Sequence, residues 1–327
     1  MKFSHIYIES DVRNHPRTQK ILSNWKDSVL IEVEDYKHVF NRSNLHFQAQ
    51  KKTPRLILAN KKDRFIYNGS PLTDTFHRGK FYYNTTILNC TYNCDYCFLQ
   101  GMYASSHIVV FINLEDFFSE VDRILESENK CILSISYETD LLALERYIPY
   151  TREWLDFSKD RPNLELEIRT KSSSFKDIQS IPSQPNAILA WTLSPEEVIQ
   201  KYEKKTPTLN RRLENISRAI ENGWNVRLSF DPVLHMKGWR SIYDAFLSKV
   251  FSSIPPEKIY DISLGVFRIS PDYLKKIKKQ REDSDLLYYP FQLRKNSMTY
   301  PESIEDSLKA FMIEKVSNFY PKEKIFH

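Results

Sequence analysis

The chain is poor in glycine and cysteine, and it has no long apolar run. Only 6 of its 327 residues are glycine, so it offers no glycine-rich loop of the P-loop or dinucleotide-binding kind. Four cysteines in a chain of this length do not make a disulfide scaffold. No stretch approaches the roughly 18 apolar residues of a membrane span. The amino terminus also lacks the apolar run of a signal peptide, and we expect a cytoplasmic protein with no membrane partner.

Neither sign of charge dominates the composition. Lys and Arg number 47 against 42 Asp and Glu, for a formal net charge of +5. This balance permits a nucleic-acid partner without requiring one. The 41% of hydrophobic and 13% of aromatic residues fit a folded enzyme. At this length the chain can bury a substantial core, and α/β barrels of similar size often form one domain.

Three of the four cysteines, Cys90, Cys94 and Cys97, stand in the spacing C-x₃-C-x₂-C. Three thiolates leave one iron of a four-iron cluster without a protein ligand, whereas clusters that only transfer electrons usually take four cysteines. With the aromatic Tyr96 directly before the third cysteine, this spacing resembles the motif of radical S-adenosylmethionine (SAM) enzymes. The motif implies a [4Fe-4S] cluster and SAM as cofactors, which together produce a 5′-deoxyadenosyl radical that abstracts hydrogen from a substrate.

A zinc site and a chance arrangement are the alternatives for the cysteine triplet. Its spacing is a poor match to the paired spacings of zinc sites. The nearest following histidine, His107, begins an apolar run that is typical of a strand. Disulfide pairing is disfavoured because so tight a triplet strains the pairing geometry. The spacing therefore favours the open iron–sulfur cluster, with zinc as the weaker interpretation.

From residue 85 onward, predicted strands and helices alternate. The strands are 85–89, 131–136, 164–169, 187–193, 225–230 and 261–267, and 108–112 is a further extended segment. Helical spacing of apolar residues occurs at 114–127, 144–158, 209–221 and 239–252. This alternation predicts an α/β fold with a parallel sheet, a partial (β/α)6 barrel. We expect a small α/β cap at 1–80, the barrel core at 81–270 and a carboxyl-terminal extension at 271–327, ending in a helix at about 304–318.

Polar residues follow successive predicted strands at the same end. The cysteine triplet follows the first strand, and the later groups are 137–140, 170–171, 192–194 and 231–232. In barrels of parallel strands the chemistry lies at the carboxyl ends of the strands. Each group alone fits an ordinary polar loop, but their succession favours one shared pocket.

The order and spacing of these pieces resemble the spore photoproduct lyase family, radical SAM enzymes that reverse a thymine lesion in DNA. The resemblance runs over the full length and rests on segments 6–9, 90–100, 140, 170–171, 191–194, 231–232, 238–239 and 318–325. It implies a radical SAM lyase that repairs a DNA photolesion. It also implies damaged DNA and a low-potential reductant, such as flavodoxin or ferredoxin, as partners.

The resemblance implies roles for individual residues. Cys90, Cys94 and Cys97 would ligate the cluster. Tyr96, a candidate catalytic residue, would lie against the adenine or ribose of SAM.

Four further residues would bind SAM. Thr139 and Asp140 would contact its polar groups, and Thr192 would supply a hydroxyl on the fourth strand. Lys171 would pair with the methionine carboxylate, a charge-assisted bond that is strong in a dry site.

Two positions depart from the family pattern. The lesion-repair enzymes carry a hydrogen-donor cysteine three residues before the aspartate that Asp140 matches, and here that position is Tyr137. Cys131 lies six residues before Tyr137 on a predicted strand, roughly 20 Å away at about 3.3 Å per residue. The family tyrosine after the third cysteine is replaced by Phe98. Tyr137 or an external donor is therefore the candidate for returning hydrogen to the substrate.

Segment 293–300 corresponds to a basic, aromatic hairpin that the family inserts at the lesion. Two basic runs are candidates for phosphate contacts, which would make DNA affinity salt-dependent; solvated surface is the alternative. They are Lys51, Lys52, Arg55, Lys61, Lys62 and Arg64, and Lys275, Lys276, Lys278, Lys279 and Arg281. A radical SAM enzyme with another nucleic-acid or peptide substrate, and a non-catalytic cluster-containing DNA-binding protein, are the alternative functions.

Overall fold

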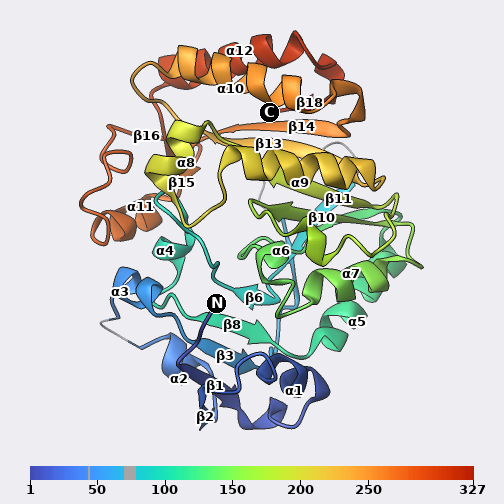
Figure 1. Cartoon of the computed structure of the whole chain (residues 1–327). Coiled ribbons are helices and arrows are strands. Elements are labelled where there is room, and N and C mark those ends of the chain that lie inside the picture. The colour runs from blue at the N-terminus through green and yellow to red at the C-terminus, as the bar shows by residue number, and fades with distance from the viewer. Residues whose placement is uncertain (43–44, 70–78) are drawn as a thin grey trace.

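The computed structural model describes residues 1–42, 45–69 and 79–327, and its strands form two main sheets (Figure 1). The smaller sheet, in the lower half of Figure 1, has the order β2-β1-β3-β8-β6. Its strands are β1 (His5–Glu9), β2 (Val29–Val33), β3 (Leu56–Ala59), β6 (Ile87–Leu88) and β8 (Ile108–Phe111). All pairs are parallel except β6 with β8. Strands β3 and β8 are buried along their whole length, which is typical of parallel strands that are covered on both faces.

The larger sheet has the order β18-β14-β13-β11-β10-β9-β5-β4. Six neighbouring parallel strands form its centre: β5 (Lys80–Asn84), β9 (Cys131–Ser134), β10 (Leu164–Thr170), β11 (Ala187–Thr192), β13 (Asn225–Val233) and β14 (Asp261–Val266). The short strands β4 (Ile66–Asn68) and β18 (Ile325–Phe326) form the two edges. The sheet curls into a half-barrel, which confirms the predicted α/β fold. The division at residues 80 and 270 stays a prediction, and 70–78, beside the first boundary, lie outside the described residues.

The helices are α1 (Pro16–Leu22), α2 (Lys37–Phe40), α3 (Phe47–Lys52), α4 (Leu99–Met102), α5 (Leu114–Ser127), α6 (Leu141–Leu144), α7 (Tyr150–Ser158), α8 (Glu196–Tyr202), α9 (Leu209–Glu221), α10 (Trp239–Ser253), α11 (Pro271–Lys278) and α12 (Glu302–Ser317). The predicted helices at 114–127 and 209–221 are confirmed as α5 and α9. Helix α7 packs on β10, α9 on β13 and α12 on β14. No helix in the described part of the chain has the length and apolar character that crossing a bilayer requires.

Two predictions of secondary structure are wrong. The first barrel strand is β5, whereas 85–89 contributes only β6, in the other sheet. Both segments carry a short apolar or aromatic run between polar residues, and such a local pattern does not say which sheet a strand joins. The helix expected at 144–158 begins only at Tyr150, as α7, whereas α6 ends at Leu144. Pro149 lies directly before α7, and proline disfavours helical conformation in the residue that precedes it. At the start of α7, Glu145 accepts hydrogen bonds from the backbone N–H groups of Thr151 (2.8 Å) and Arg152 (3.1 Å).

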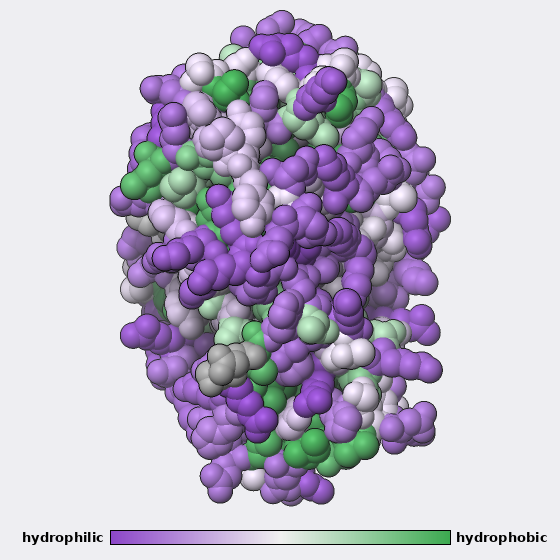
Figure 2. Space-filling model, turned by 90° about the vertical axis from the view of Figure 1, so that its left-hand side faces the viewer, coloured by the Kyte–Doolittle hydropathy of each residue, from purple (hydrophilic) through white to green (hydrophobic). Residues whose placement is uncertain are grey.

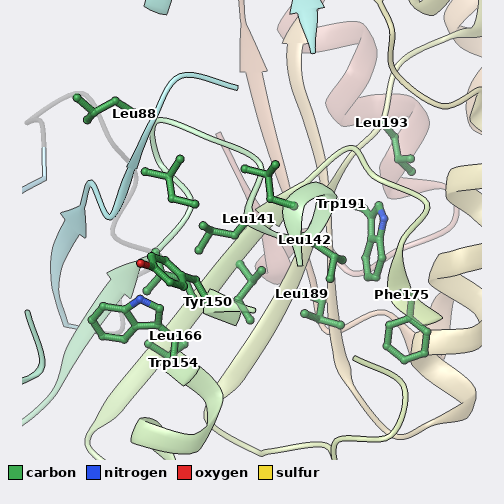
Figure 3. Close-up of a cluster of buried hydrophobic side chains, with 14 of the residues drawn as sticks. Leu88, Leu141, Leu142, Tyr150, Trp154, Leu166, Phe175, Leu189, Trp191 and Leu193 are labelled. Carbon is green, nitrogen blue, oxygen red and sulfur yellow. The ribbon is translucent and has the colours of Figure 1, made fainter. Parts of the chain in front are cut away.

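The core lies between the half-barrel and its helices. Figure 3 shows Tyr150 and Trp154 of α7 close to Leu166 of β10, and all three are fully buried. The Tyr150 hydroxyl donates to the carbonyl of Phe111, at 2.6 Å, and so joins α7 to the smaller sheet. The two sheets therefore share one core, and the outer surface in Figure 2 is mainly hydrophilic, with apolar residues in small separate groups.

The carboxyl-terminal extension contains a hairpin. Strands β16 (Gln292–Arg294) and β17 (Ser297–Thr299) pair antiparallel, and β15 (Arg268–Ile269) pairs with β17. The turn residues Lys295 and Asn296 have φ of 45° and 65°, as a type I′ hairpin turn requires. The hairpin expected within 293–300 is thus present.

Candidate active site

A cavity of about 410 Å³ opens at the carboxyl ends of the half-barrel strands. Every residue that the sequence suggested for the site lines it: Cys90, Cys94, Tyr96, Cys97, Tyr137, Thr139, Asp140, Lys171 and Thr192. They come from the cysteine loop and from the ends of β9, β10 and β11. The common direction of the parallel strands brings these distant segments together.

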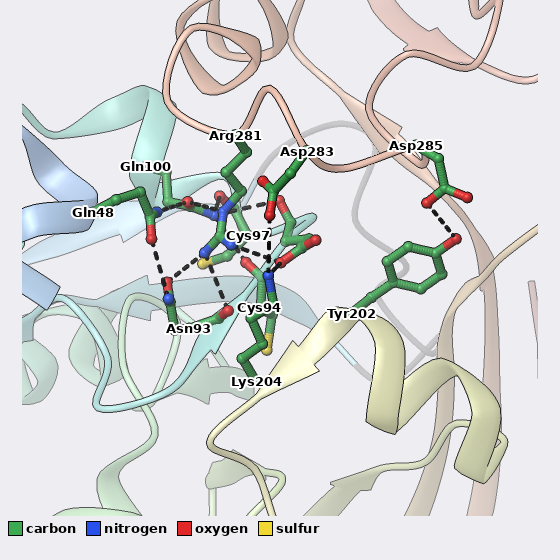
Figure 4. Close-up of polar contacts among 11 residues, drawn as sticks. Gln48, Asn93, Cys94, Cys97, Gln100, Tyr202, Lys204, Arg281, Asp283 and Asp285 are labelled. Carbon is green, nitrogen blue, oxygen red and sulfur yellow. Dashed lines mark hydrogen bonds and ion pairs between the residues drawn. The ribbon is translucent and has the colours of Figure 1, made fainter. Parts of the chain in front are cut away.

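The cysteine loop is held from outside the cavity. Its short strand β7 (Asn93–Cys94) pairs antiparallel with β12 (Glu203–Lys204). The Arg281 guanidinium donates to the Asp95 carboxylate (2.6 Å), the Gln100 side chain (2.5 Å) and the carbonyl of Asn93 (3.1 Å) (Figure 4). Arg281 is only 3% exposed. Its assignment to a phosphate-binding run is therefore wrong, because a run of basic letters does not reveal which side chain turns inward.

Lys51 is a second basic residue that faces the loop rather than solvent. It is buried, and its ammonium donates to the carbonyl of Cys90. Burial lowers the pKa of Lys51, against the opposing effect of the neighbouring cysteines. No sequence pattern indicates this contact, because helix α3 lies far from the loop along the chain.

All four cysteines are free thiols. Burial raises the pKa of Cys90 to about 11 and also raises the pKa of Cys94 and Cys97. Within residues 1–42, 45–69 and 79–327, no three His, Cys, Asp or Glu side chains converge closely enough to hold a single metal ion. An iron–sulfur cluster does not require its ligands to converge on one point, because each thiolate binds a different iron.

Glu203 connects the polar side chains around Cys94. Its carboxylate accepts hydrogen bonds from the Tyr96 hydroxyl, Ser194 (3.0 Å) and Arg212 (2.5 Å). The Lys171 ammonium lies 3.6 Å from it and 5.2 Å from the centre of the Tyr96 ring. Burial alone would raise the pKa of Glu203, but the nearby cations, Arg212 first, lower it to about 2. Glu203 and Arg212 were not among the predicted site residues, since neither belongs to a recognisable motif.

Asp140 positions the segment that carries Lys171. One carboxylate oxygen accepts from Ala143 N (3.0 Å) and Thr170 Oγ1 (2.8 Å), and the other accepts from Lys171 N (2.7 Å). The hydroxyl of Thr139 is buried and has no hydrogen-bond partner among the described residues. A buried hydroxyl normally has a partner, so this group suits a polar ligand in the cavity.

A family model described as spore photoproduct lyase matches residues 3–327. The chain belongs to this family. Membership confirms the sequence-based expectation of a radical SAM lyase of DNA photolesion repair.

Relatives and solved structures agree with this assignment. The chain is 18% identical to the spore photoproduct lyase of Clostridium acetobutylicum, over 73% of this chain and 74% of that protein. It is 17% identical to that of Bacillus subtilis, over 98% and 96%. A structure of spore photoproduct lyase complexed with dinucleoside spore photoproduct has a TM-score of 0.85 at 14% identity, over 99% and 97% of the chains. A mutant with bound AdoMet and the same dinucleoside has a TM-score of 0.84 at 14% identity. These structures show the shared fold.

In this member of the spore photoproduct lyase family, the cavity wall beside the cysteine loop is aromatic. Tyr137 lines the cavity, and its ring centre lies 6.2 Å from that of Phe98 and 4.2 Å from that of Tyr83. Cys131 is buried on β9 and does not line the cavity, as expected from its place in the sequence. Tyr137, which occupies the sequence position where the resemblance implies a cysteine, is thus part of the cavity wall.

Glu138, next to Tyr137, gives this spore photoproduct lyase homologue a testable pH dependence. Burial raises the pKa of the Glu138 carboxyl from 4.5 to about 7, although the Tyr103 hydroxyl donates to it. Because the folded pKa lies above the unfolded one, this group stabilises the fold fully below pH 4.5 and the contribution is lost as pH rises through 7. The free energy of unfolding of the wild type should therefore fall as pH rises. In the Glu138→Gln protein this fall should be smaller by up to about 3 kcal/mol. Urea unfolding of both proteins between pH 4.5 and 8 measures it, and parallel curves would contradict the assignment.

Proposed function

We propose that Cys90, Cys94 and Cys97 hold a [4Fe-4S] cluster at which the enzyme cleaves SAM, and that it repairs the spore photoproduct in DNA. The observation that carries this proposal is the single cavity that contains the three thiols together with every residue expected to bind SAM. The thiols are buried beside the cationic groups of Lys51 and Lys171, and this positive environment suits an anionic cluster of thiolates and sulfides.

The chain's own residues orient SAM in this proposal. When bound, the cluster and SAM together supply the 5′-deoxyadenosyl radical. Lys171 binds the methionine carboxylate, and Glu203 keeps the Lys171 ammonium at the cavity wall until it does. Tyr96 packs against the adenine or ribose, with its hydroxyl anchored on Glu203. Thr139 offers its unpartnered hydroxyl to a polar group of SAM.

Asp140 and Thr192 complete the SAM site. The Asp140 carboxylate already accepts three hydrogen bonds, so it both fixes the Lys171 backbone and contributes negative charge toward the polar groups of SAM. The hydroxyl of Thr192 lies at the end of β11, on the cavity wall. Both residues therefore act at the carboxyl end of the sheet, where ligands of such folds bind.

DNA is the proposed macromolecular partner. The solved relatives hold a dinucleoside spore photoproduct, and the hairpin β16–β17 carries Leu293, which is 64% exposed. Helix α11 adds the basic residues Lys275, Lys276 and Lys278. A lesion base has to leave the stack to reach a buried radical, and such extrusion takes wedge and phosphate contacts. A low-potential protein such as flavodoxin or ferredoxin would reduce the cluster.

Tyr137 is the proposed hydrogen donor that replaces the family's cysteine. It lines the cavity with its ring on the side of Phe98. A phenol O–H is a hydrogen-atom donor, whereas the Phe98 ring carries no such group. Tyr137 therefore takes the donor role for which the family uses a thiol.

The test is anaerobic reconstitution with iron, sulfide, reductant and SAM, followed by incubation with DNA that contains the spore photoproduct or with matched undamaged DNA. We expect restored thymine and lesion-dependent 5′-deoxyadenosine. Formation of 5′-deoxyadenosine without restored thymine, at the same rate on both DNAs, would contradict the proposal. Stimulation by another nucleic acid or a peptide would instead favour a different substrate, which the replacement of both relay residues by Tyr137 and Phe98 makes the second candidate.

A further inference from the structure

Three tyrosine rings stack in a row that begins at the cavity and leads away from it. The ring centres of Tyr137 and Tyr83 are 4.2 Å apart with an interplanar angle of 25°, and those of Tyr83 and Tyr67 are 5.1 Å apart at 14°. Both pairs are stacked, at the short end of the separations that aromatic pairs adopt. Only the first of the three rings lines the cavity. We call Tyr137, Tyr83 and Tyr67 the tyrosine row.

The register of the larger sheet builds this row. Tyr67 of β4 and Tyr83 of β5 are direct partners across an antiparallel pair, so their side chains stand on the same face. Tyr83 in turn pairs with Ser134 of β9, and the chain that continues from β9 brings Tyr137 onto the Tyr83 ring. The row therefore follows three neighbouring chain segments from the catalytic end of the sheet to its edge strand.

The two ends of the row differ in their surroundings. Tyr137 lies next to Phe98 beside the cysteine loop. Tyr67, on edge strand β4, is partly exposed, and its hydroxyl accepts a hydrogen bond from the Lys61 ammonium at 3.2 Å. In the middle, burial raises the pKa of Tyr83 to about 12. Tyr83 is therefore a phenol at neutral pH. Tyr67, at the outer end, has access to solvent and to a surface reductant.

Aromatic packing alone would not need three phenols. A phenylalanine stacks as well as a tyrosine, and it avoids placing a hydroxyl in a partly buried position. Contact between rings at these separations also allows an unpaired electron to pass from one ring to the next. A row of phenols is therefore suited to moving a radical, whereas a row of phenylalanines is not.

We propose that the tyrosine row carries the radical away from Tyr137 after it has given its hydrogen to the substrate, so that the enzyme is restored at Tyr67 by a surface reductant. This inference rests on the proposed function. The Tyr137 O–H bond breaks as a C–H bond forms on the substrate radical, leaving Tyr137 as a neutral phenoxyl radical. Tyr83 and then Tyr67 each supply one electron and one proton to the preceding ring. The phenol of Tyr67 is restored by one electron and one proton. The electron comes from a one-electron reductant of the low-potential class that serves the cluster, and the proton comes from water.

The experiment compares the reconstituted wild type with Tyr83→Phe and Tyr67→Phe on lesion-bearing DNA. Rapid-freeze electron paramagnetic resonance is recorded on protein grown with ring-deuterated tyrosine, since a tyrosyl signal narrows on deuteration. Without Tyr83 the radical stays on Tyr137. We therefore expect a persistent tyrosyl signal, and thymine formation that stops after the first turnover, although iron content and SAM cleavage in that turnover are retained. Tyr147→Phe, a partly buried tyrosine packed on Trp25 outside the cavity, is the matched control and should behave as wild type.

The outcomes separate this inference from the proposed function. If the wild type restores no thymine, the proposed function itself is contradicted, whatever the variants do. A wild type that restores thymine, together with Tyr83→Phe and Tyr67→Phe proteins that sustain the same number of turnovers and show no longer-lived tyrosyl signal, overturns the tyrosine row alone. Equal loss in Tyr147→Phe also overturns it, because the effect would then not be specific to the row.

Discussion

Replacement of Cys94 by alanine is expected to abolish cluster binding and SAM cleavage together. Cys94 is 7% exposed and lies on β7, where it is held opposite Glu203. With only two thiolates, the proposed cluster would have a second iron without a protein ligand, and no further cysteine of the described residues lines the cavity to replace Cys94. We expect activity to fall to the uncatalysed level, a loss of at least about 10⁶-fold. Iron and sulfide analysis, visible absorption and 5′-deoxyadenosine formation measure the loss.

Cys131→Ala is the matched control for this change. Cys131 is buried on β9, outside the cavity, so its removal should cost only about 1 kcal/mol of stability and leave the cluster in place. A Cys94→Ala protein that still cleaves SAM would show that Cys94 is not a ligand. A Cys131→Ala protein without a cluster would show that the ligand set is different.

The sequence predicted the half-barrel well because its evidence is local. Helices α5 and α9 have strong three-to-four spacing of apolar residues, and both were expected at their observed bounds. Strands β10 and β13 alternate apolar with polar residues. Both lie between helices, and an alternation of strands and helices along the chain favours a parallel sheet. The errors arose where pairing is non-local. Whether residues 80–84 or 85–89 enter the barrel depends on partners in β9 and β8, which no local pattern records.

Prediction of the site also succeeded where the evidence is local and failed where it depends on distant segments. Residues of the cysteine motif and those after β9, β10 and β11 were expected in one pocket, since parallel strands end on the same side. The sequence did not predict the charged residues that support the cysteine loop, because they reach it from distant segments of the chain. These residues are Glu203, Arg212, Lys51 and Arg281. Their positions depend on tertiary packing. Charged groups are seldom fully buried without partners, and single-sequence patterns do not identify those partners.

Replacement of Glu203 by glutamine is expected to destabilise the protein strongly. The change leaves the fully buried Arg212 without its anionic partner, and Lys171 loses the carboxylate that lies 3.6 Å from its ammonium. Removing one member of a buried ion pair typically costs about 3–5 kcal/mol, because the remaining charge is uncompensated in a low-dielectric site. The free energy of unfolding, measured with urea near neutral pH, should fall by this amount.

The control for Glu203→Gln is Glu120→Gln, which removes a carboxylate from a surface pair with Arg123 on α5. Such exposed pairs contribute at most about 1 kcal/mol, so the control should unfold almost as the wild type does. Equal stability of the Glu203→Gln protein and the control would mean that Arg212 finds another partner. In that case Glu203 would not be the group that holds Tyr96 and Lys171 in place beside Cys94. A large loss confined to Glu203→Gln would instead show that the charge network behind the cysteine loop stabilises the same part of the fold that positions the SAM site.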